Sequence, residues 1–312
     1  MRVRGLSAGA VAVSLAALVA GCGGSSHQSA TTSHTASTPR HGSIPAMLAE
    51  KGPNVSVVPG DEDFAVGPVR FSFLLIDDQG ATVYRPRVRV VLASSTDSAP
   101  IATTSASLEP IGVPGVDPSI GDVNKLYVAH LRASRAGKYA LGIETLGARP
   151  VQAATTIVVR THPQAPAVGS QAIASNTPTI GSTHGNFKEL TTRTPPDKGL
   201  LRYSVAASLA AHSPFVLVFA TPKFCTSRTC GPVVDVVDAV RRQFATTDIR
   251  FIHVEVYKNN NPGLGYNRWF KQWRLPTEPW IFLVGADGKI KERFEGSVSV
   301  GELAAAVRRN LA

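Results

Sequence analysis

Residues 215–232 read Phe-Val-Leu-Val-Phe-Ala-Thr-Pro-Lys-Phe-Cys-Thr-Ser-Arg-Thr-Cys-Gly-Pro, and this stretch decides the fold of the C-terminal part of the chain. Its first six residues are continuously apolar, which predicts a strand that is buried on both faces. Cys225 and Cys230 follow in a short loop, and Pro232 favours the first turn of a helix that continues to Phe244. The stretch therefore predicts a strand, a loop with two cysteines, and a helix.

The flanking sequence extends this unit over residues 200–312. Ser204 caps an expected helix before the buried strand, and Ser299 with Glu302 forms a capping-box pattern at the start of a final helix. Strands are expected over 249–256, 280–284 and 289–294, with Asp287-Gly288 as the hairpin turn between the last two. A short helix is expected over 266–273. The predicted order is helix, strand, helix, strand, helix, strand, strand, helix.

This order, with a cysteine loop after the first buried strand, resembles the thioredoxin fold. Two further features support the resemblance: Pro279 directly before the strand at 280–284, and the Gly285-Ala-Asp-Gly-Lys-Ile290 hairpin. Thioredoxin-like proteins carry a cis-proline at the position of Pro279, facing the active cysteine. The resemblance therefore implies thiol–disulfide exchange, with Cys225 attacking, Cys230 resolving and Pro279 shaping the substrate groove. Lys223 and Arg228, close in sequence, favour the Cys225 thiolate.

The cysteine spacing departs from the Cys-x-x-Cys of thioredoxins, because four residues separate Cys225 from Cys230. On an ideal helix their Cα atoms would lie about 8.6 Å apart, beyond the roughly 4.4–6.8 Å that a disulfide spans. The two thiols can therefore pair only if residues 225–230 are partly non-helical. The buried acid of the family aligns near Leu217, which is apolar. Glu255 is the candidate substitute, although a surface or strand-end glutamate is the simpler expectation.

Other interpretations of the cysteine pair stay open. A permanent Cys225–Cys230 disulfide can staple the loop of a non-enzymatic binding or scaffold lipoprotein. Thr221-Pro222 resembles the motif of peroxiredoxins with a Cys-x4-Cys pair, but the threonine is one residue too far from Cys225. Copper delivery through two cysteines and His253 resembles some thioredoxin-like membrane proteins, but their spacing is Cys-x3-Cys. We expect no cofactor and no metal site.

The start of the chain resembles a bacterial lipoprotein signal. A basic Met1-Arg-Val-Arg4 precedes an apolar run over 6–20 that ends in Leu18-Val-Ala-Gly-Cys22, a lipobox pattern. The resemblance implies cleavage before Cys22 and lipidation of its thiol, with palmitate among the acyl chains. An ordinary signal peptide with a chance cysteine is the alternative. We expect a signal peptide over 1–21 and a chain anchored by lipid to the extracytoplasmic face of the cell membrane.

The rest of the chain divides by composition. Residues 22–54 are polar and predict a disordered tether, and residues 162–199 are rich in Pro, Gly, Ser and Thr and predict a linker that can lie across one domain. Residues 55–161 contain short strand patterns separated by turn signals, which predict a β-sandwich. The run 136–142 resembles the closing hairpin of bacterial immunoglobulin-like domains. The fold class is therefore multi-domain: an all-β immunoglobulin-like sandwich followed by an α/β thioredoxin-like fold at 200–312.

Composition and charge limit the function further. The 312 residues are 43% hydrophobic and 17% charged, which excludes wholesale disorder. Lipid on Cys22 accounts for the odd number of cysteines, since the chain has 3. The net charge of +10 arises mainly from residues 200–312, but no basic run exceeds two residues, so no nucleic-acid partner is expected. The expected partners are thiols or disulfides of exported proteins, or a redox partner protein, and the membrane through the anchor.

Overall fold

The computed structural model describes residues 43–49, 52–53, 55–115, 123–147, 150–224 and 233–312. Residues 39–312 form one compact unit. Within the described ranges, no helix is long and apolar enough to cross a membrane. Cys22, Cys225 and Cys230 lie outside the described residues. The lipidation site and the cysteine pair therefore stay predictions.

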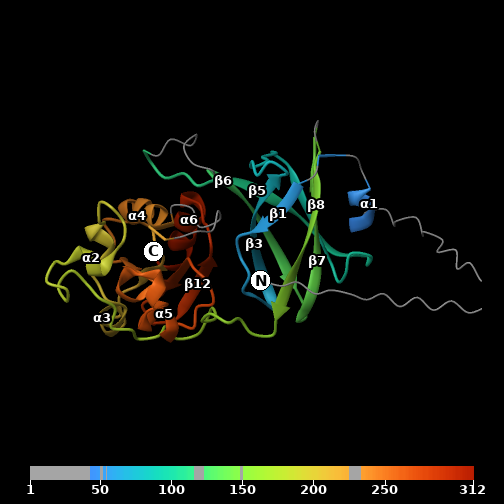
Figure 1. The fold of residues 1–312 in the computed structure, drawn as a ribbon. Coiled ribbons are helices and arrows are strands. Elements are labelled where there is room, and N and C mark those ends of the chain that lie inside the picture. The colour runs from blue at the N-terminus through green and yellow to red at the C-terminus, as the bar shows by residue number, and fades with distance from the viewer. Residues whose placement is uncertain (1–42, 50–51, 54, 116–122, 148–149, 225–232) are drawn as a thin grey trace, which may run out of the picture. The chain divides into compact units, whose positions relative to one another are not determined.

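The N-terminal module is an eight-stranded sheet with the strand order β1-β3-β6-β5-β4-β7-β8-β2 (Figure 1). The strands are β1 (Val55–Pro59), β2 (Phe64–Ala65), β3 (Gly67–Asp77), β4 (Val88–Ala93), β5 (Pro100–Pro110), β6 (Lys125–Ala133), β7 (Gly137–Thr145) and β8 (Gln152–Arg160). Residues 100–106 of β5 pair with β4, whereas residues 106–110 pair with β6. One strand thus joins both halves of the sheet. The prediction that strands build this module is confirmed, whereas its immunoglobulin-like class stays a prediction.

The two halves of this sheet share one apolar core. Phe71 stacks on Phe73 within β3, and Phe73 stacks on Tyr127 of β6, with ring centroids 5.1 Å apart in both pairs. The same cluster contains Val90 of β4 and Leu141 of β7, from the other half. Side chains from both halves therefore exclude water from one interior, which is the main source of stability for such a module.

Two elements of this module have only a weak sequence signal. In β5, burial alternates over 102–108, but Ala106 is the one buried residue and most inward positions are small, so the apolar alternation is weak. Helix α1 (Ile44–Leu48) forms within the segment expected to be a tether, and Ser43 caps it. Ile44 is fully buried against Ala93 and Ala140. Gly142 makes this docking possible, because a Cβ there would lie 2.9 Å from Ile44 Cγ1.

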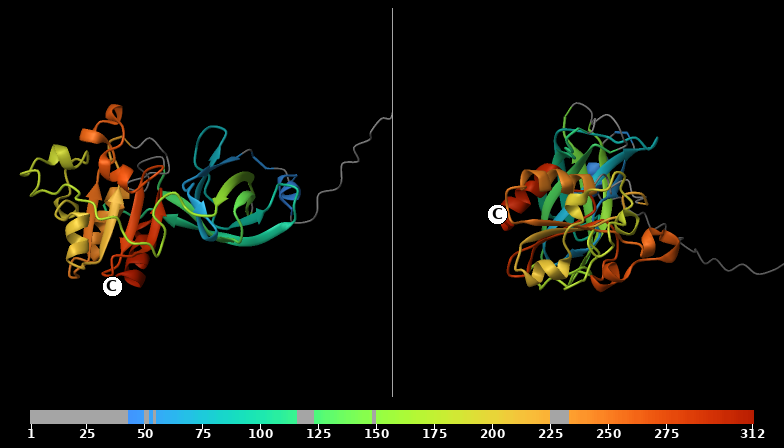
Figure 2. Two further views of the ribbon diagram at one scale, coloured as in Figure 1. Left: turned by 90° about the horizontal axis from the view of Figure 1, so that it is seen from below. Right: turned by 90° about the vertical axis from the view of Figure 1, so that its left-hand side faces the viewer.

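The C-terminal module has a four-stranded mixed sheet in the order β10-β9-β11-β12. Its elements are α3 (Val205–Ala210), β9 (Phe215–Phe219), α4 (Val233–Gln243), β10 (Arg250–Val254), α5 (Arg268–Gln272), β11 (Trp280–Val284), β12 (Ile290–Glu295) and α6 (Val300–Asn310). Strand β10 is parallel to β9, whereas β11 is antiparallel to both β9 and β12. The element order is the one that the sequence predicts. Figure 2 shows helices on both faces of this sheet.

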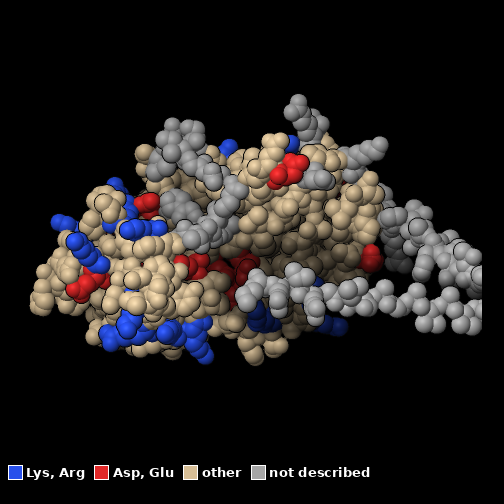
Figure 3. All heavy atoms as spheres, in the orientation of Figure 1, with Lys and Arg blue, Asp and Glu red and all other residues tan. Residues whose placement is uncertain are grey.

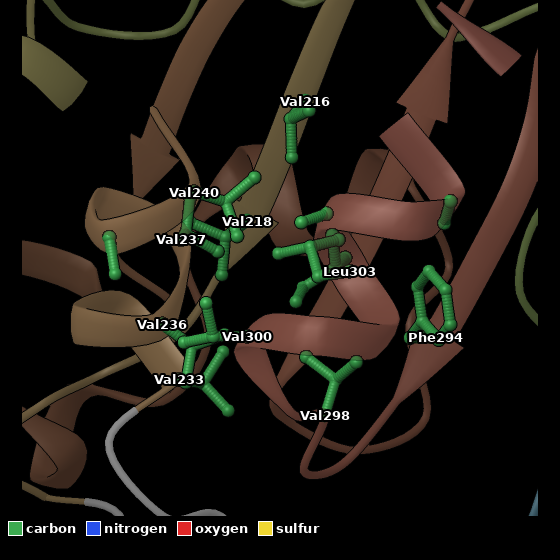
Figure 4. Close-up of a cluster of buried hydrophobic side chains, with 14 of the residues drawn as sticks. Val216, Val218, Val233, Val236, Val237, Val240, Phe294, Val298, Val300 and Leu303 are labelled. Atoms are coloured by element: carbon green, nitrogen blue, oxygen red, sulfur yellow. The ribbon is translucent and has the colours of Figure 1, made fainter. Parts of the chain in front are cut away.

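Burial on both faces of the sheet explains the continuous apolar run of β9. Val216 and Val218 point into the cluster formed with α4 and α6, whereas Phe215, Leu217 and Phe219 point into the opposite cluster with α5. Figure 4 shows Val237 and Val240 of α4 and Leu303 of α6 around Val218. Leu217 is fully buried among apolar side chains. The position where the family carries an acid is therefore part of the core.

Residues 162–199 run along the C-terminal module. Gly169 N donates to Ile290 O (2.8 Å), and Ala172 N donates to Gly288 O (2.8 Å), so the segment is bonded to the β12 hairpin. Further along, Trp273 Nε1 donates to Ser175 Oγ (3.0 Å). The segment also contains helix α2 (Phe187–Leu190) and the 3₁₀ turn η1 (Lys198–Leu200). These residues therefore lie across the C-terminal module, as the sequence prediction for this segment allows.

Arg70 of β3 connects the N-terminal module to α6. Its Nε donates to Glu302 Oε1 (2.7 Å), its Nη1 donates to Asp61 Oδ1 (2.9 Å), and its Nη2 donates to Ser297 O (2.8 Å). Ser299 caps α6 as predicted, because its Oγ accepts from Glu302 N (2.9 Å). The Glu302 carboxylate, which a capping box directs back to the helix start, is instead bound by Arg70.

Candidate functional site

The candidate site lies at the carboxyl ends of the parallel strands β9 and β10, where open α/β sheets commonly bind ligands. The backbone after β9 is held by three hydrogen bonds. Thr221 N donates to Glu278 Oε2 (3.2 Å), Lys223 N donates to Thr192 Oγ1 (3.1 Å), and Phe224 N donates to Thr221 O (3.3 Å). Cys225 follows Phe224 directly in the chain. The described residues therefore position the segment that leads to the predicted nucleophile.

The peptide between Glu278 and Pro279 is cis, as the resemblance implies. Pro279 is buried at the start of β11, and its carbonyl accepts a hydrogen bond from Gly296 N (2.9 Å). Of the two prolines before this strand, Pro279 is the cis residue, and the bond before Pro276 is not cis. The role of Pro279 in substrate binding stays a prediction.

Glu278 is the titratable group beside the loop after β9. Its Oε1 accepts from the hydroxyl of Tyr257 (3.1 Å) and its Oε2 accepts from Thr221 N. Burial raises the pKa of the Glu278 carboxyl to about 7, and the charge of Glu255 acts in the same direction, while the two hydrogen bonds oppose the rise. Burial, followed by the charge of Glu278, raises the pKa of Tyr257 to about 12. Glu278 therefore exists in both protonation states near neutral pH.

No motif in the sequence assigns a role to Glu278. The one available signal is its place directly before the expected cis-proline at the start of a buried strand. Its elevated pKa comes from burial in the folded chain and, to a smaller extent, from the charge of Glu255, and no local pattern reveals either cause. A half-buried carboxyl with a pKa near 7 is the type of group that accepts and returns a proton in catalysis.

Glu255 lies at the end of a strand, as one of the two alternatives expects, but it is buried and not a surface residue. It follows β10 directly and is 4% exposed. Its Oε1 accepts from Thr192 N (2.5 Å) and from Thr192 Oγ1 (2.8 Å), whereas its Oε2 has no hydrogen-bond partner among the described residues. The segment 162–199 covers the carboxylate, so its burial depends on residues that the sequence marks only as a linker.

His253 is a packed core histidine. It is 4% exposed, and its Nε2 lies 3.1 Å from the carbonyl oxygen of Ala220. Burial lowers the pKa of this imidazole. Among the described residues, no group of three or more His, Cys, Asp or Glu side chains could hold a metal ion.

Trp273 and Trp280 belong to the core and do not form a groove. Trp273 packs on Phe219 and Phe282, and Trp280 is stacked on Phe282 with ring centroids 5.7 Å apart. Trp269 differs, because it lines a cavity of about 730 Å³. We call this the α2–α5 cavity, and three segments line it: 178–190, 255–260 and 266–271. Trp269 therefore borders this cavity, whereas Trp273 and Trp280 are fully buried.

Comparisons with known proteins give distant structural neighbours. No family model matches the chain, and no curated protein matches it. A thiol:disulfide interchange protein of the thioredoxin family from Chlorobium tepidum TLS is 16% identical, with a TM-score of 0.32, covering 47% of this chain and 100% of its own. The Lin-41 filamin domain is 18% identical, with a TM-score of 0.21, covering 36% of this chain and 100% of its own. The N-terminal Ig1-2 module of the Drosophila receptor protein tyrosine phosphatase DLAR is 14% identical, with a TM-score of 0.19, covering 41% of this chain and 59% of its own.

Proposed function

We propose that the chain is a thioredoxin-like protein, anchored by lipid outside the cytoplasmic membrane, that exchanges thiols and disulfides with exported proteins. Residues 55–161 serve in this proposal as an immunoglobulin-like sandwich that supports the thioredoxin-like domain. One observation carries the proposal: a cis-proline peptide whose preceding residue, Glu278, is hydrogen-bonded to the segment that leads into Cys225.

The reaction consists of two thiolate displacements. The Cys225 thiolate attacks one sulfur of a substrate disulfide, the substrate S–S bond breaks, and the released sulfur leaves as a thiolate that takes a proton. Cys230 then attacks the Cys225 sulfur of the mixed disulfide, which frees the second substrate thiol and leaves a Cys225–Cys230 disulfide. Glu278 accepts the proton of an attacking thiol and returns it to a leaving thiolate. The reverse sequence oxidises a dithiol, and a redox partner protein restores the starting state.

Trapping of the mixed disulfide tests this proposal. The Cys230→Ser variant is expected to accumulate covalent adducts with disulfide-bearing exported proteins, because its mixed disulfide lacks the resolving thiol. The Cys225→Ser variant is expected to accumulate none and to lose insulin reduction. Both variants are compared with the unaltered chain on non-reducing gels and by mass spectrometry. A pair with a reduction potential below about −300 mV and no adducts would show that the disulfide is a structural staple.

Replacement of Cys22 by alanine tests the membrane anchor separately. The change removes the thiol that takes the lipid, so the chain is expected to leave the membrane fraction, since each buried acyl CH₂ contributes about 0.8 kcal/mol to membrane binding. Immunoblots of separated membrane and soluble fractions measure the effect, with Cys230→Ala as the matched cysteine control. An unchanged membrane fraction for the Cys22→Ala variant would reject the lipoprotein assignment.

A further inference from the structure

We propose that the α2–α5 cavity binds an acidic peptide segment of the partner protein, next to the thiol site. The inference rests on the proposed function, because it identifies the class of substrate that this site takes. The partner chemistry is a stretch of chain with two or more carboxylates and an apolar or aromatic side chain, close to the cysteine that exchanges. Four features of the cavity support this inference: its position, its charge, its aromatic lining and its volume.

The cavity adjoins the site through Tyr257. Its ring lines the cavity, while its hydroxyl donates to Glu278 at the cis-proline peptide. The ring of Phe224, the residue before Cys225, contacts the Tyr257 ring edge-on with centroids 6.4 Å apart. A peptide that presents its cysteine to the loop after β9 can therefore extend into the cavity with its flanking residues.

The charges of the cavity favour a carboxylate ligand. Lys188, Lys258, Arg268 and Lys271 line it, and none of them has an ion-pair partner among the described residues. Of the two lining carboxylates, Glu189 accepts from Asn186 Nδ2 (2.6 Å), whereas Glu255 binds Thr192 through Oε1 and keeps Oε2 without a partner among the described residues. Figure 3 shows Lys and Arg side chains gathered over α5 and beside α2.

Several basic side chains elsewhere in the module are partnered within the chain, although others, such as Lys289 and Arg308, have no ion pair among the described residues. Arg193 pairs with Asp235 (2.6 Å), Arg241 pairs with Asp238 (2.6 Å), and Arg309 pairs with Glu292 (2.7 Å). The cations of the cavity therefore differ from these, since their charge is available to a ligand. Complementary charge at a rim of this kind steers association and selects acidic partners.

One wall of the cavity is a stack of aromatic rings. Tyr257 and Tyr266 are parallel with centroids 5.5 Å apart, and Tyr266 stacks on Phe270 at 4.3 Å. Tyr266 is 36% exposed, so part of its surface is free for an apolar or aromatic side chain. The loop between the tyrosines holds Asn259 and Asn260 at a φ of 53°, and Asn260 Nδ2 bonds to Lys188 O (2.8 Å), which fixes the loop against α2.

The concave shape favours a peptide over a membrane surface. A volume of about 730 Å³ lies within the range of sites that enclose a ligand. A flat layer of anionic headgroups would meet the outer cations but would leave the aromatic wall and the inner end at Glu255 unfilled. A peptide segment with carboxylates and one aromatic side chain matches both the charge and the wall.

Binding of a cysteine-free peptide tests the inference. The protein is the full chain with Cys225→Ser and Cys230→Ser, and the probe is a fluorescein-labelled ten-residue peptide with three glutamates and one phenylalanine. By anisotropy, this peptide is expected to bind about tenfold more tightly than the same peptide with glutamine in place of glutamate. The preference is expected to fall with added salt.

Charge reversal assigns the binding to the cavity. The Lys258→Glu/Arg268→Glu variant is expected to weaken binding of the acidic peptide about tenfold, whereas Lys289→Glu/Arg308→Glu, outside the cavity, leaves it within about twofold. Circular dichroism confirms that each variant is folded.

Three results would overturn the inference: equal binding of both peptides, equal loss in both charge-reversal variants, or cation-dependent binding to anionic phospholipid vesicles without peptide binding. Because neither the peptide nor this protein variant carries a reacting cysteine, the binding measurement is independent of thiol exchange. Peptide binding without trapped mixed disulfides would reject the enzymatic proposal and leave an acidic-peptide binding site. Trapped adducts without a peptide preference would reject only the binding inference.

Discussion

Replacement of Glu278 by glutamine is expected to slow thiol–disulfide exchange about 10²-fold at pH 7, the lower end of what a positioned acid–base group contributes. Glutamine keeps the size of the side chain and an oxygen that can accept from Thr221 N, but it can neither take nor release a proton. The measurement is the rate of reduction of a disulfide-linked fluorogenic peptide by the reduced protein.

The pH dependence of the exchange rate shows whether Glu278 acts as a base. Because the pKa of Glu278 is raised to about 7, the group is protonated below that pH and becomes a base above it. The exchange rate of the unaltered chain is therefore expected to rise through pH 7, and the Glu278→Gln variant is expected to lose this step. Glu62→Gln, which changes an exposed glutamate outside the α2–α5 cavity, is the matched control. An unchanged rate profile in the Glu278→Gln variant would remove the carboxyl from the mechanism.

Replacement of Arg70 by alanine is expected to lower the free energy of unfolding by about 3–5 kcal/mol, the cost of breaking a buried ion pair from one side. The change removes the hydrogen bonds to Asp61, Glu302 and Ser297 and leaves two carboxylates without their counter-charge. Asp61 is 5% exposed, so water cannot replace the lost partner at its carboxylate. Urea unfolding followed by tryptophan fluorescence measures the effect.

The cost of this substitution is expected to depend on pH. Burial raises the pKa of Asp61 to about 7 despite Arg70, so the folded chain binds a proton there more strongly than the unfolded chain does. The contribution of Asp61 to stability is thus largest at low pH and is lost as pH rises towards 7. The Arg70→Ala variant should therefore lose more stability at pH 8 than at pH 5, because protonation relieves the unpaired carboxylate at the lower pH.

Two matched variants complete the experiment. Arg309→Ala removes an exposed ion pair with Glu292 and is expected to cost at most about 1 kcal/mol. Arg70→Met combined with Asp61→Asn and Glu302→Gln removes the charges together and is expected to recover part of the loss. Equal losses in Arg70→Ala and Arg309→Ala would contradict the importance of the network.

Elements with a strong local pattern could be predicted from the sequence. The strand at 280–284 has the predicted bounds, and Ser204 and Ser299 cap the helices that follow them. These features depend on hydrogen bonds within three residues or on continuous apolar runs, so neighbouring residues contain the required information. The thioredoxin resemblance implies a cis peptide at Pro279, and the structure has it.

Elements without a strong local pattern could not be predicted. Strand β5 is mostly exposed, and its pairing with both β4 and β6 depends on partners far along the chain. Residues 162–199 look like a linker because their composition is polar and rich in proline, yet they bury Ala165 and Trp273 and shield Glu255. Their placement is determined by the surface that they cover.

The sequence by itself determined the order of helices and strands and the two-module organisation. It also led to the prediction that Cys225 and Cys230 react and that Cys22 carries lipid. Only the tertiary structure decided that Glu278 titrates near pH 7 and that Arg70 occupies the Glu302 carboxylate. The reason is physical, because desolvation and charge interactions depend on distance in space. Glu278 meets Thr221 across 57 positions of sequence, and Arg70 meets Glu302 across 232.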